Sequence, residues 1–359
     1  MHKILSINPG ATSTKISLYD DLSPIFVESI RHTKEELQNY NNNSDQYRFR
    51  AALIEEFLDR NSIDIKELSA VVGRGGPFKP LESGTYRVSE KMMDDVKNNR
   101  VQADHISNIG CLLANEIAQK AGGIPAFIVD PVSVDEFIPE ARVSGLPEIP
   151  RISLAHALNI KMVGKKFSDD HPEFNKGYDE MNLVIAHLGG GISITSHQKG
   201  RMIDVNNAND EGPFSPQRVG TLPVTQLAEL CYSGKFPQYS DMKKHLIKEG
   251  GLHALIGIED MIEMEKEIAN GNKEALFYLN AMGYQIAKYI GAYAVPLAGD
   301  IDAIIITGGI AYTKQLMRYI EEKVSWIAPV YVYPGEDEME ALTRGALRVL
   351  NNVEKEMEY

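Results

Sequence analysis

The sequence contains few cysteines and no long apolar run. Cys111 and Cys231 are its only cysteines in 359 residues, too few for a disulfide framework, so both are expected to be reduced. No stretch approaches the roughly 18 apolar residues of a membrane-spanning helix. The apolar run at the start is short and is broken by Pro9, which is unlike a signal peptide. These absences predict a cytoplasmic protein with no membrane partner.

Positive charge is also scarce. The formal net charge is -13, and no block of lysines and arginines occurs. Binding to the phosphate backbone of a nucleic acid needs a basic surface, so a nucleic-acid partner is not expected. An anionic ligand would have to be held by a few locally placed cations.

The two commonest phosphate-binding patterns are absent as well, because neither GxxxxGK followed by Ser or Thr nor GxGxxG occurs. Glycines nevertheless follow apolar segments at Gly10, at Gly189-Gly190-Gly191 and at Gly308-Gly309. A glycine turn lets backbone N–H groups approach phosphate oxygens, and three such turns favour a polyphosphate ligand. A second strand follows the first two turns rather than a helix, which disfavours Walker and Rossmann architectures.

The composition is that of an ordinary globular protein, with 43% hydrophobic and 24% charged residues. A chain of 359 residues is expected to form two domains. Hydrophobic periodicity alternates between strands and helices, which predicts an α/β fold. The expected strands lie near 4–7, 15–20, 126–132, 182–195 and 302–311 and within "LSAVVGRGGPF" (68–78), which ends in glycines. One expected helix carries the apolar residues Ala51, Leu53, Ile54, Phe57 and Leu58, and the others lie near 105–121, 153–168, 223–233, 273–294, 312–324 and 338–350.

One pattern occurs twice. "ILSINPGATSTKISLYD" and "LVIAHLGGGISITSHQKGRMID" both read strand, glycine turn, strand, and then an acid, Asp20 or Asp204. This repeat predicts a duplicated α/β unit, one copy in each half, with a cleft between the halves. The apolar stripe of helix 273–294 fits core packing about as well as a subunit contact, and a homodimer or higher homo-oligomer is expected.

Several motifs together resemble the acetate and butyrate kinase family of the actin-like ATPase clan. They are "INPGATSTK", "IAHLGGGISI" and "ITGGIA". "ARVSG" and "DVNNANDEGPFSPQRVGTLP" are most like the butyrate kinases of that family. The resemblance implies two ribonuclease-H-like domains, 1–150 with 340–359 and 151–339. It also implies Mg²⁺-dependent phosphoryl transfer from ATP to a short carboxylic acid.

The resemblance also assigns roles to individual residues. Arg218, His187, Asp130 and His105 match catalytic positions, and Glu338 with Asn8 matches the metal-associated positions. The nucleotide-binding positions are Asn8, Gly10, Thr12, Ser13, Lys15, Gly189, Gly190, Gly191, Gly308, Gly309 and Ile310. Taken alone, each of the polar residues has an ordinary structural explanation as a turn, cap or solvated side chain.

The segment "VVGRGG" departs from the pattern of the acetate kinases. The arginine that binds the acid in that family has no counterpart at the same position, and Arg74 is the nearest candidate. Gly73 stands where the acetate enzymes have a valine that lines the acyl pocket, so the sequence predicts extra room for a longer acid. We therefore expect butyrate as the substrate, with acetate, propionate or a branched acid as alternatives. An actin-like or chaperone-like nucleotide switch is the alternative from another class.

Overall fold

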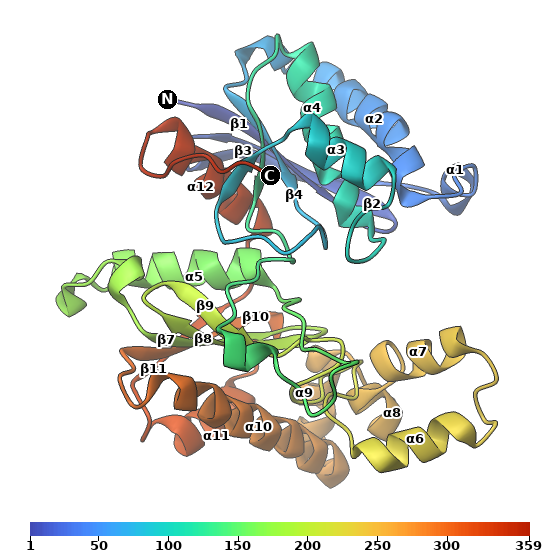
Figure 1. Ribbon diagram of the computed structural model, residues 1–359, viewed down its shortest axis with the longest axis vertical. Coiled ribbons are helices and arrows are strands. Elements are labelled where there is room, and N and C mark those ends of the chain that lie inside the picture. Colours follow the sequence, from blue (N-terminus) through green and yellow to red (C-terminus); the bar gives the residue numbers. More distant parts are fainter. The chain divides into compact units, whose positions relative to one another are not determined.

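The computed structural model describes residues 1–359, and the chain forms two compact units. Unit 1 comprises Met1–Asp135, Ala157–Lys161 and Asp337–Tyr359. Unit 2 comprises Glu136–His156 and Met162–Glu336. Each unit contains one mixed β-sheet with helices on its faces (Figure 1), which confirms the predicted α/β class with two domains.

The sheet of unit 1 has six strands in the order β3-β2-β1-β4-β6-β5. β1, β2 and β3 form an antiparallel meander, and β4 and β6 continue the sheet parallel to β1. β5 closes the far edge antiparallel to β6. The strands are β1 (Lys3–Pro9), β2 (Ser13–Asp20), β3 (Ser23–Arg31), β4 (Ala70–Arg74), β5 (Thr85–Arg87) and β6 (Ala126–Val129).

The sheet of unit 2 has five strands in the order β11-β10-β7-β8-β9. Again three consecutive strands form an antiparallel meander, and two later strands extend the sheet parallel to the first of them. The strands are β7 (Leu183–Leu188), β8 (Ile192–Gln198), β9 (Arg201–Val205), β10 (Ala303–Gly308) and β11 (Val330–Pro334). Both units thus have the same strand order apart from β5, which confirms the duplication predicted from the repeated pattern.

Residues of β1 alternate between two helical layers of unit 1. Leu5 and Ile7 belong to the core that includes α2 and α4, whereas the hydroxyl of Ser6 bonds that of Thr343 on α12 at 2.9 Å. Figure 1 shows α12 on one side of the sheet and α2 to α4 on the other. The helices are α1 (Lys34–Leu37), α2 (Tyr47–Arg60), α3 (Glu90–Lys97), α4 (Gly110–Lys120) and α12 (Glu338–Leu350).

The core of unit 2 lies between its sheet and α10, whose buried stripe includes Leu279, Met282, Ile286 and Ile290. The predicted stripe of helix 273–294 is therefore largely core. Helix α5 packs on the other face, where Gly164 approaches Ile185. The helices are α5 (Ala157–Asp170), α6 (Val224–Tyr232), α7 (Tyr239–Ile247), α8 (Gly251–Ile256), α9 (Met261–Ala269), α10 (Lys273–Ala294) and α11 (Lys314–Val324).

Two helices do not stay with the strands that precede them. α12 follows β11 of unit 2 in the sequence, yet it packs on β1, β4 and β6 of unit 1. α5 follows β6 of unit 1, yet from Met162 onward it belongs to unit 2, where Phe167 contacts Tyr331.

The units do not coincide with the predicted domains at 136–150, which belong to unit 2, or at 157–161 and 337–339, which belong to unit 1. The reason for the first of these differences is a set of bonds to β9. Ile138 N donates to the Ile203 carbonyl, and Arg151 pairs with Asp204 at 2.9 Å. No helix in the structure has the length and apolarity needed to cross a membrane.

Candidate active site

Three predicted site residues of unit 1 meet at the carboxyl ends of β1 and β4. Asn8 Nδ2 donates to Glu338 Oε2 at 2.5 Å, and Arg74 Nη1 pairs with Glu338 Oε1 at 2.7 Å. Glu338 is the first residue of α12, so the helix that covers the sheet also brings this carboxylate to the strand ends. Both carboxylate oxygens therefore have a donor from a predicted site residue.

Arg74 retains donors beyond this ion pair, because no described bond involves its Nε or Nη2. His105 is the N-cap of a short 3-10 helix, and its Nδ1 lies 2.7 Å from Ser107 Oγ. Burial by surrounding atoms and the charge of Arg74 lower the pKa of His105. The ring is therefore neutral at pH 7, beside a guanidinium with free donors.

The β1–β2 turn brings together the predicted phosphate-binding residues of unit 1. Gly10 N donates to the Ser13 carbonyl at 2.8 Å, which closes a tight turn. Lys15 is exposed on β2 and is the register partner of Asn8 on β1, so the two side chains share one face of the hairpin. Thr12 is exposed at the tip. The turn thus presents an amide, an ammonium group and hydroxyls, which are groups that bind phosphate oxygens.

Arg50 on α2 was not predicted from the sequence as a site residue. Its side chain is fully buried, and it donates to the carbonyl oxygens of Gly10 at 2.8 Å and Ser13 at 3.0 Å. A signal existed, because Arg50 shares a helical face with the buried Ile54 and Leu58, where the periodicity calls for an apolar residue. A cation at such a position indicates a specific set of acceptors nearby.

His32 lies next to this arginine, and we expect it to make stability depend on pH. Thr14 Oγ1 accepts from Arg50 Nη1 at 3.0 Å and lies 2.8 Å from His32 Nε2, with which it shares a hydrogen bond. Burial, and then the charge of Arg50, lower the pKa of His32 from 6.5 to about 4. Between these two values only the unfolded chain binds the proton, so stability falls as the pH falls.

From pH 7 to pH 5, His32 should account for a loss of about 2 kcal/mol in the free energy of unfolding. Urea denaturation of the wild type and of His32→Gln at both pH values tests this, because the variant lacks the titrating group. An equal loss in the two proteins would contradict the assignment.

Asp130 follows β6 and has a positive φ of 36°, a strained backbone conformation for a residue other than glycine. Its Oδ1 accepts from Ser83 Oγ at 2.7 Å and from Gly84 N at 2.8 Å. The carboxylate therefore anchors the 83–84 loop through one oxygen. Its predicted catalytic role stays a prediction.

The sequence predicted room for a longer acid at Gly73 because glycine has no side chain. The structure contradicts this reason. A Cβ atom on Gly73 would overlap the backbone of Gly110, and one on Gly110 would overlap the carbonyl of Arg74. The space is already filled by the start of α4, so β4 and α4 cross at a pair of glycines.

We expect Gly73→Ala to lower the free energy of unfolding by about 2 kcal/mol, because backbone atoms must move apart. Urea denaturation measures the loss. Gly291→Ala is the matched control, since nothing lies within 4 Å of its added methyl group. A Gly73 variant as stable as the control would show that the crossing relaxes without cost.

In unit 2, His187 and Arg218 lie beside the glycine turn between β7 and β8. The Arg218 guanidinium occupies the space where a Cβ of Gly191 would be, so a larger residue there would displace it. A Cβ on Gly189 would lie 3.3 Å from His187 Nε2. Arg218 Nη1 donates to the Ala208 carbonyl at 3.0 Å, and burial lowers its pKa. The structure therefore brings these predicted residues together.

The turn after β10 lies next to the same place. Gly308 has a φ of 94°, and a Cβ there would overlap the Leu188 carbonyl at the end of β7. Thr307 is the register partner of His187. Gly309 begins a 3-10 helix in which Ile310 is buried. The glycine turns after β7 and β10 thus lie side by side at the carboxyl ends of these two neighbouring strands.

Glu336 was also missed from the sequence. Its Oε2 lies 3.4 Å from Nε2 of His187, and the His187 ring stacks on His156 with centroids 4.2 Å apart. Glu336 follows a glycine after β11, a place where the sequence offers several acids and no means of choosing among them.

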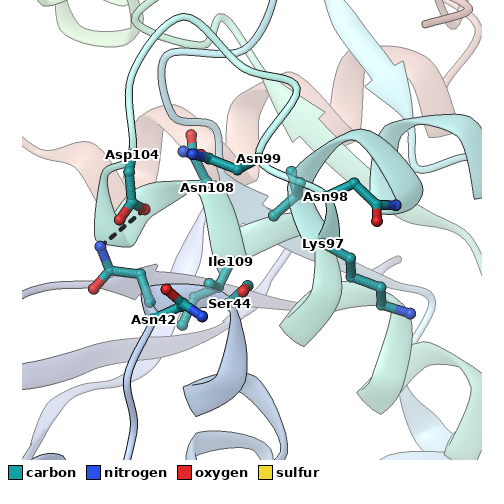
Figure 2. Close-up of a pocket in the computed structure, with 10 residues that line it drawn as sticks. Asn42, Ser44, Lys97, Asn98, Asn99, Asp104, Asn108 and Ile109 are labelled. Atoms are coloured by element: carbon teal, nitrogen blue, oxygen red, sulfur yellow. Dashed lines mark hydrogen bonds between the residues drawn. The ribbon is translucent and has the colours of Figure 1, made fainter.

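A cavity of about 260 Å³ lies elsewhere in unit 1, among polar side chains that include Asn42, Asn98, Asn99 and Asp104 (Figure 2). None of the predicted site residues lines it. Two of the residues that line this cavity are hydrogen-bonded to each other: Asn43 Nδ2 donates to Asp104 Oδ1 at 3.0 Å.

The side chains of the candidate site could bind Mg²⁺ only if the phosphates of a nucleotide supplied some of its ligands. No group of three or more His, Cys, Asp or Glu side chains in the structure could hold a metal ion by itself. Mg²⁺ often uses one or two carboxylates, with phosphates and waters as its other ligands. Glu338 is an oxygen donor of this kind, and its predicted metal role stays a prediction.

Comparisons with known proteins agree with the fold. The model of the acetokinase family matches residues 155–325. The chain is similar to the acetate kinase of Porphyromonas gingivalis, with a TM-score of 0.79 and 18% identity over 98% of this chain and 100% of that one. A propionate kinase of Francisella tularensis gives 0.73 and 16%, over 96% and 99%. The acetate kinase of Entamoeba histolytica gives 0.74 and 16%, again over 96% and 99%.

At such identities the structural similarity is one of fold. It confirms the predicted actin-like ATPase architecture over nearly the whole chain, whereas the resemblance to butyrate kinases stays a prediction. The chain is thus similar to the acetokinase family over residues 155–325, and it is similar in fold to acetate and propionate kinases over almost its entire length.

Proposed function

We propose that the protein transfers the γ-phosphoryl group of ATP to a short-chain carboxylic acid, reversibly forming an acyl phosphate and ADP. The observation that carries the proposal is the Arg218 guanidinium packed on the Gly191 turn, with His187 beside it. An arginine, a histidine ring and open backbone amides at one strand end suit the equatorial oxygens of a transferring phosphoryl group.

The reaction brings two anions together. At about 4 Å and an effective dielectric near 20, each pair of unit charges costs roughly 4 kcal/mol. Arg218 would neutralise part of this charge on the phosphoryl group, and His187 would hydrogen-bond it. A carboxylate oxygen forms the new bond to phosphorus while the bond to the ADP oxygen breaks, and ADP leaves with that electron pair. No general base is needed, because the acid is already ionised at pH 7.

Arg74 is the residue we assign to the substrate carboxylate. It already pairs with the carboxylate of Glu338 through Nη1, and its other donors are available for a second one. Asn8, Lys15 and the β1–β2 turn would hold phosphates of the nucleotide. Mg²⁺, carried with ATP and contacted by Glu338, would screen the phosphate charge.

Butyrate is the proposed acid, because "ARVSG" and the 204–223 segment resemble butyrate kinases. The packing at Gly73 removes the argument from pocket volume, so acetate, propionate and branched acids remain alternatives. One methylene group changes specificity by only about 1–3 kcal/mol. Overlapping activities are therefore expected.

Trapping the acyl phosphate with hydroxylamine, across straight and branched acids of two to five carbons, tests both levels of the proposal. Product from any of these acids supports the carboxylate kinase. The highest kcat/KM with butyrate supports the narrower assignment, and a preference for acetate would overturn it.

A nucleotide switch is the second candidate, because the glycine-turn motifs also resemble those of the actin and chaperone ATPases in the same clan. It predicts slow ATP hydrolysis that does not depend on added acid. Turnover that requires the acid would exclude it.

A further inference from the structure

Arg50 is a buried cation beneath the β1–β2 turn, and all its donor groups are engaged there. Nη1 donates to Gly10 O at 2.8 Å and to Ser13 O at 3.0 Å. Nη2 reaches Ala11 O at 3.3 Å and Gln46 Oε1 at 2.8 Å, and Nε donates to the same Gln46 oxygen at 3.1 Å. One side chain thus binds three carbonyl groups of a four-residue turn.

The charge of Arg50 has no carboxylate partner. All its acceptors are neutral, and none of the ion pairs of the structure involves it. Burial lowers its pKa to about 10, which leaves it protonated at pH 7. Burying an unpaired cation is costly, so a site that retains one usually has an anion to bind or a backbone to hold.

The carbonyl contacts fix where the amides of the turn point. In a trans peptide the C=O and N–H groups point in opposite directions. Because the Gly10 and Ala11 carbonyls point at Arg50, the N–H groups of Ala11 and Thr12 point away from it, on the exposed side of the turn. No bond within the chain uses these two amides.

We propose that Arg50 is a positioning residue for nucleotide phosphate: it holds the β1–β2 turn so that the Ala11 and Thr12 amides face outward, and it lends the turn an unneutralised positive charge. This inference rests on the proposed function for the identity of the anion. It assigns Arg50 no contact with the nucleotide, since the turn lies between them.

The test separates the contribution of the forked guanidinium group of Arg50 from that of its positive charge. Arg50→Lys keeps the charge and loses the fork, whereas Arg50→Gln loses both. Arg48→Gln is the matched control, because Arg48 is exposed on the same helix and bonds only Tyr47. Gln46→Ala loosens Arg50 without removing it, and it serves if an Arg50 variant fails to fold.

Hydrogen exchange of residues 10–14 without nucleotide is measured first. Binding of Mg-ADP by calorimetry and steady-state kinetics follow. We expect faster exchange at Gly10 in both Arg50 variants. We also expect kcat/KM for ATP to fall about 10²-fold, because small misplacements of a binding group are this costly. The KM for the acid, held by Arg74, should stay within about 3-fold, and the control should stay near wild type.

Unchanged exchange and unchanged nucleotide affinity in Arg50→Lys and Arg50→Gln would overturn the inference. An equal loss for both substrates with a lower melting temperature would also overturn it, since that is a general loss of structure. If the wild type phosphorylates no acid, the proposed function fails, yet exchange and Mg-ADP binding still decide the role of Arg50.

Discussion

Replacing Arg218 by alanine is expected to lower kcat by about 10³-fold or more, equivalent to about 4 kcal/mol of transition-state stabilisation, while the KM for the acid changes little. The guanidinium lies on the Gly191 turn and is held there by the Ala208 carbonyl, so it is fixed before the phosphoryl group arrives. A preorganised cation stabilises developing charge without having to reorganise. Steady-state kinetics at saturating ATP measures the loss.

Arg218→Lys sharpens this test. A lysine keeps the charge but cannot reproduce the planar fork, so it should restore little activity. Arg201 on β9 is exposed, and Arg201→Ala serves as the control for a lost charge on the same unit. Near-normal turnover in Arg218→Ala would remove the central residue of the proposed mechanism.

Replacing Glu338 by alanine is expected to raise the Mg²⁺ concentration needed for half-maximal rate, and to lower kcat/KM about 10²-fold at low Mg²⁺. Two effects combine. The metal complex loses one carboxylate contact, and Asn8 and Arg74 lose the acceptor that orients them. High Mg²⁺ should restore the rate only partly, because metal cannot replace the second effect.

Kinetics over a range of Mg²⁺ concentrations separates these contributions. Glu340→Ala is the matched control, because Glu340 lies on the same turn of α12 and pairs with Arg344 on the helix surface. If Glu338 only stabilises the start of the helix, both variants should lose under about 1 kcal/mol of stability and keep their rates. That result would refute the metal role.

Much of the fold could be predicted, because buried strands and long amphipathic helices leave strong periodic signals. β1, β7 and β10 are almost continuously buried, and each ends where its glycine turn was expected. β3 was missed because it is an exposed edge strand without a clear apolar face. α7 was missed for a similar reason, since only Met242 of its residues is buried.

The site residues that directly follow a strand could be predicted from the sequence. Those whose position depends on contacts between distant parts of the chain could not. The pairing of Asn8 with Glu338 crosses most of the chain and has no local signal. Arg50 lies on a helix, far in sequence from the turn it supports, and its role follows from burial that only the folded chain reveals. The prediction at Gly73 failed because a glycine can either open a pocket or allow another backbone segment to approach closely. The sequence alone does not distinguish these two cases.

The placement of α12 has a consequence for how the chain acquires its fold during synthesis. Strands β1 to β6 leave the ribosome long before α12, the helix that covers one face of their sheet. At about 5–20 residues per second, the delay between β1 and α12 is tens of seconds. During this time the face that will meet Met339, Leu342 and Ala346 stays uncovered. Nascent chains stalled before residue 337 should therefore engage chaperones through their first sheet.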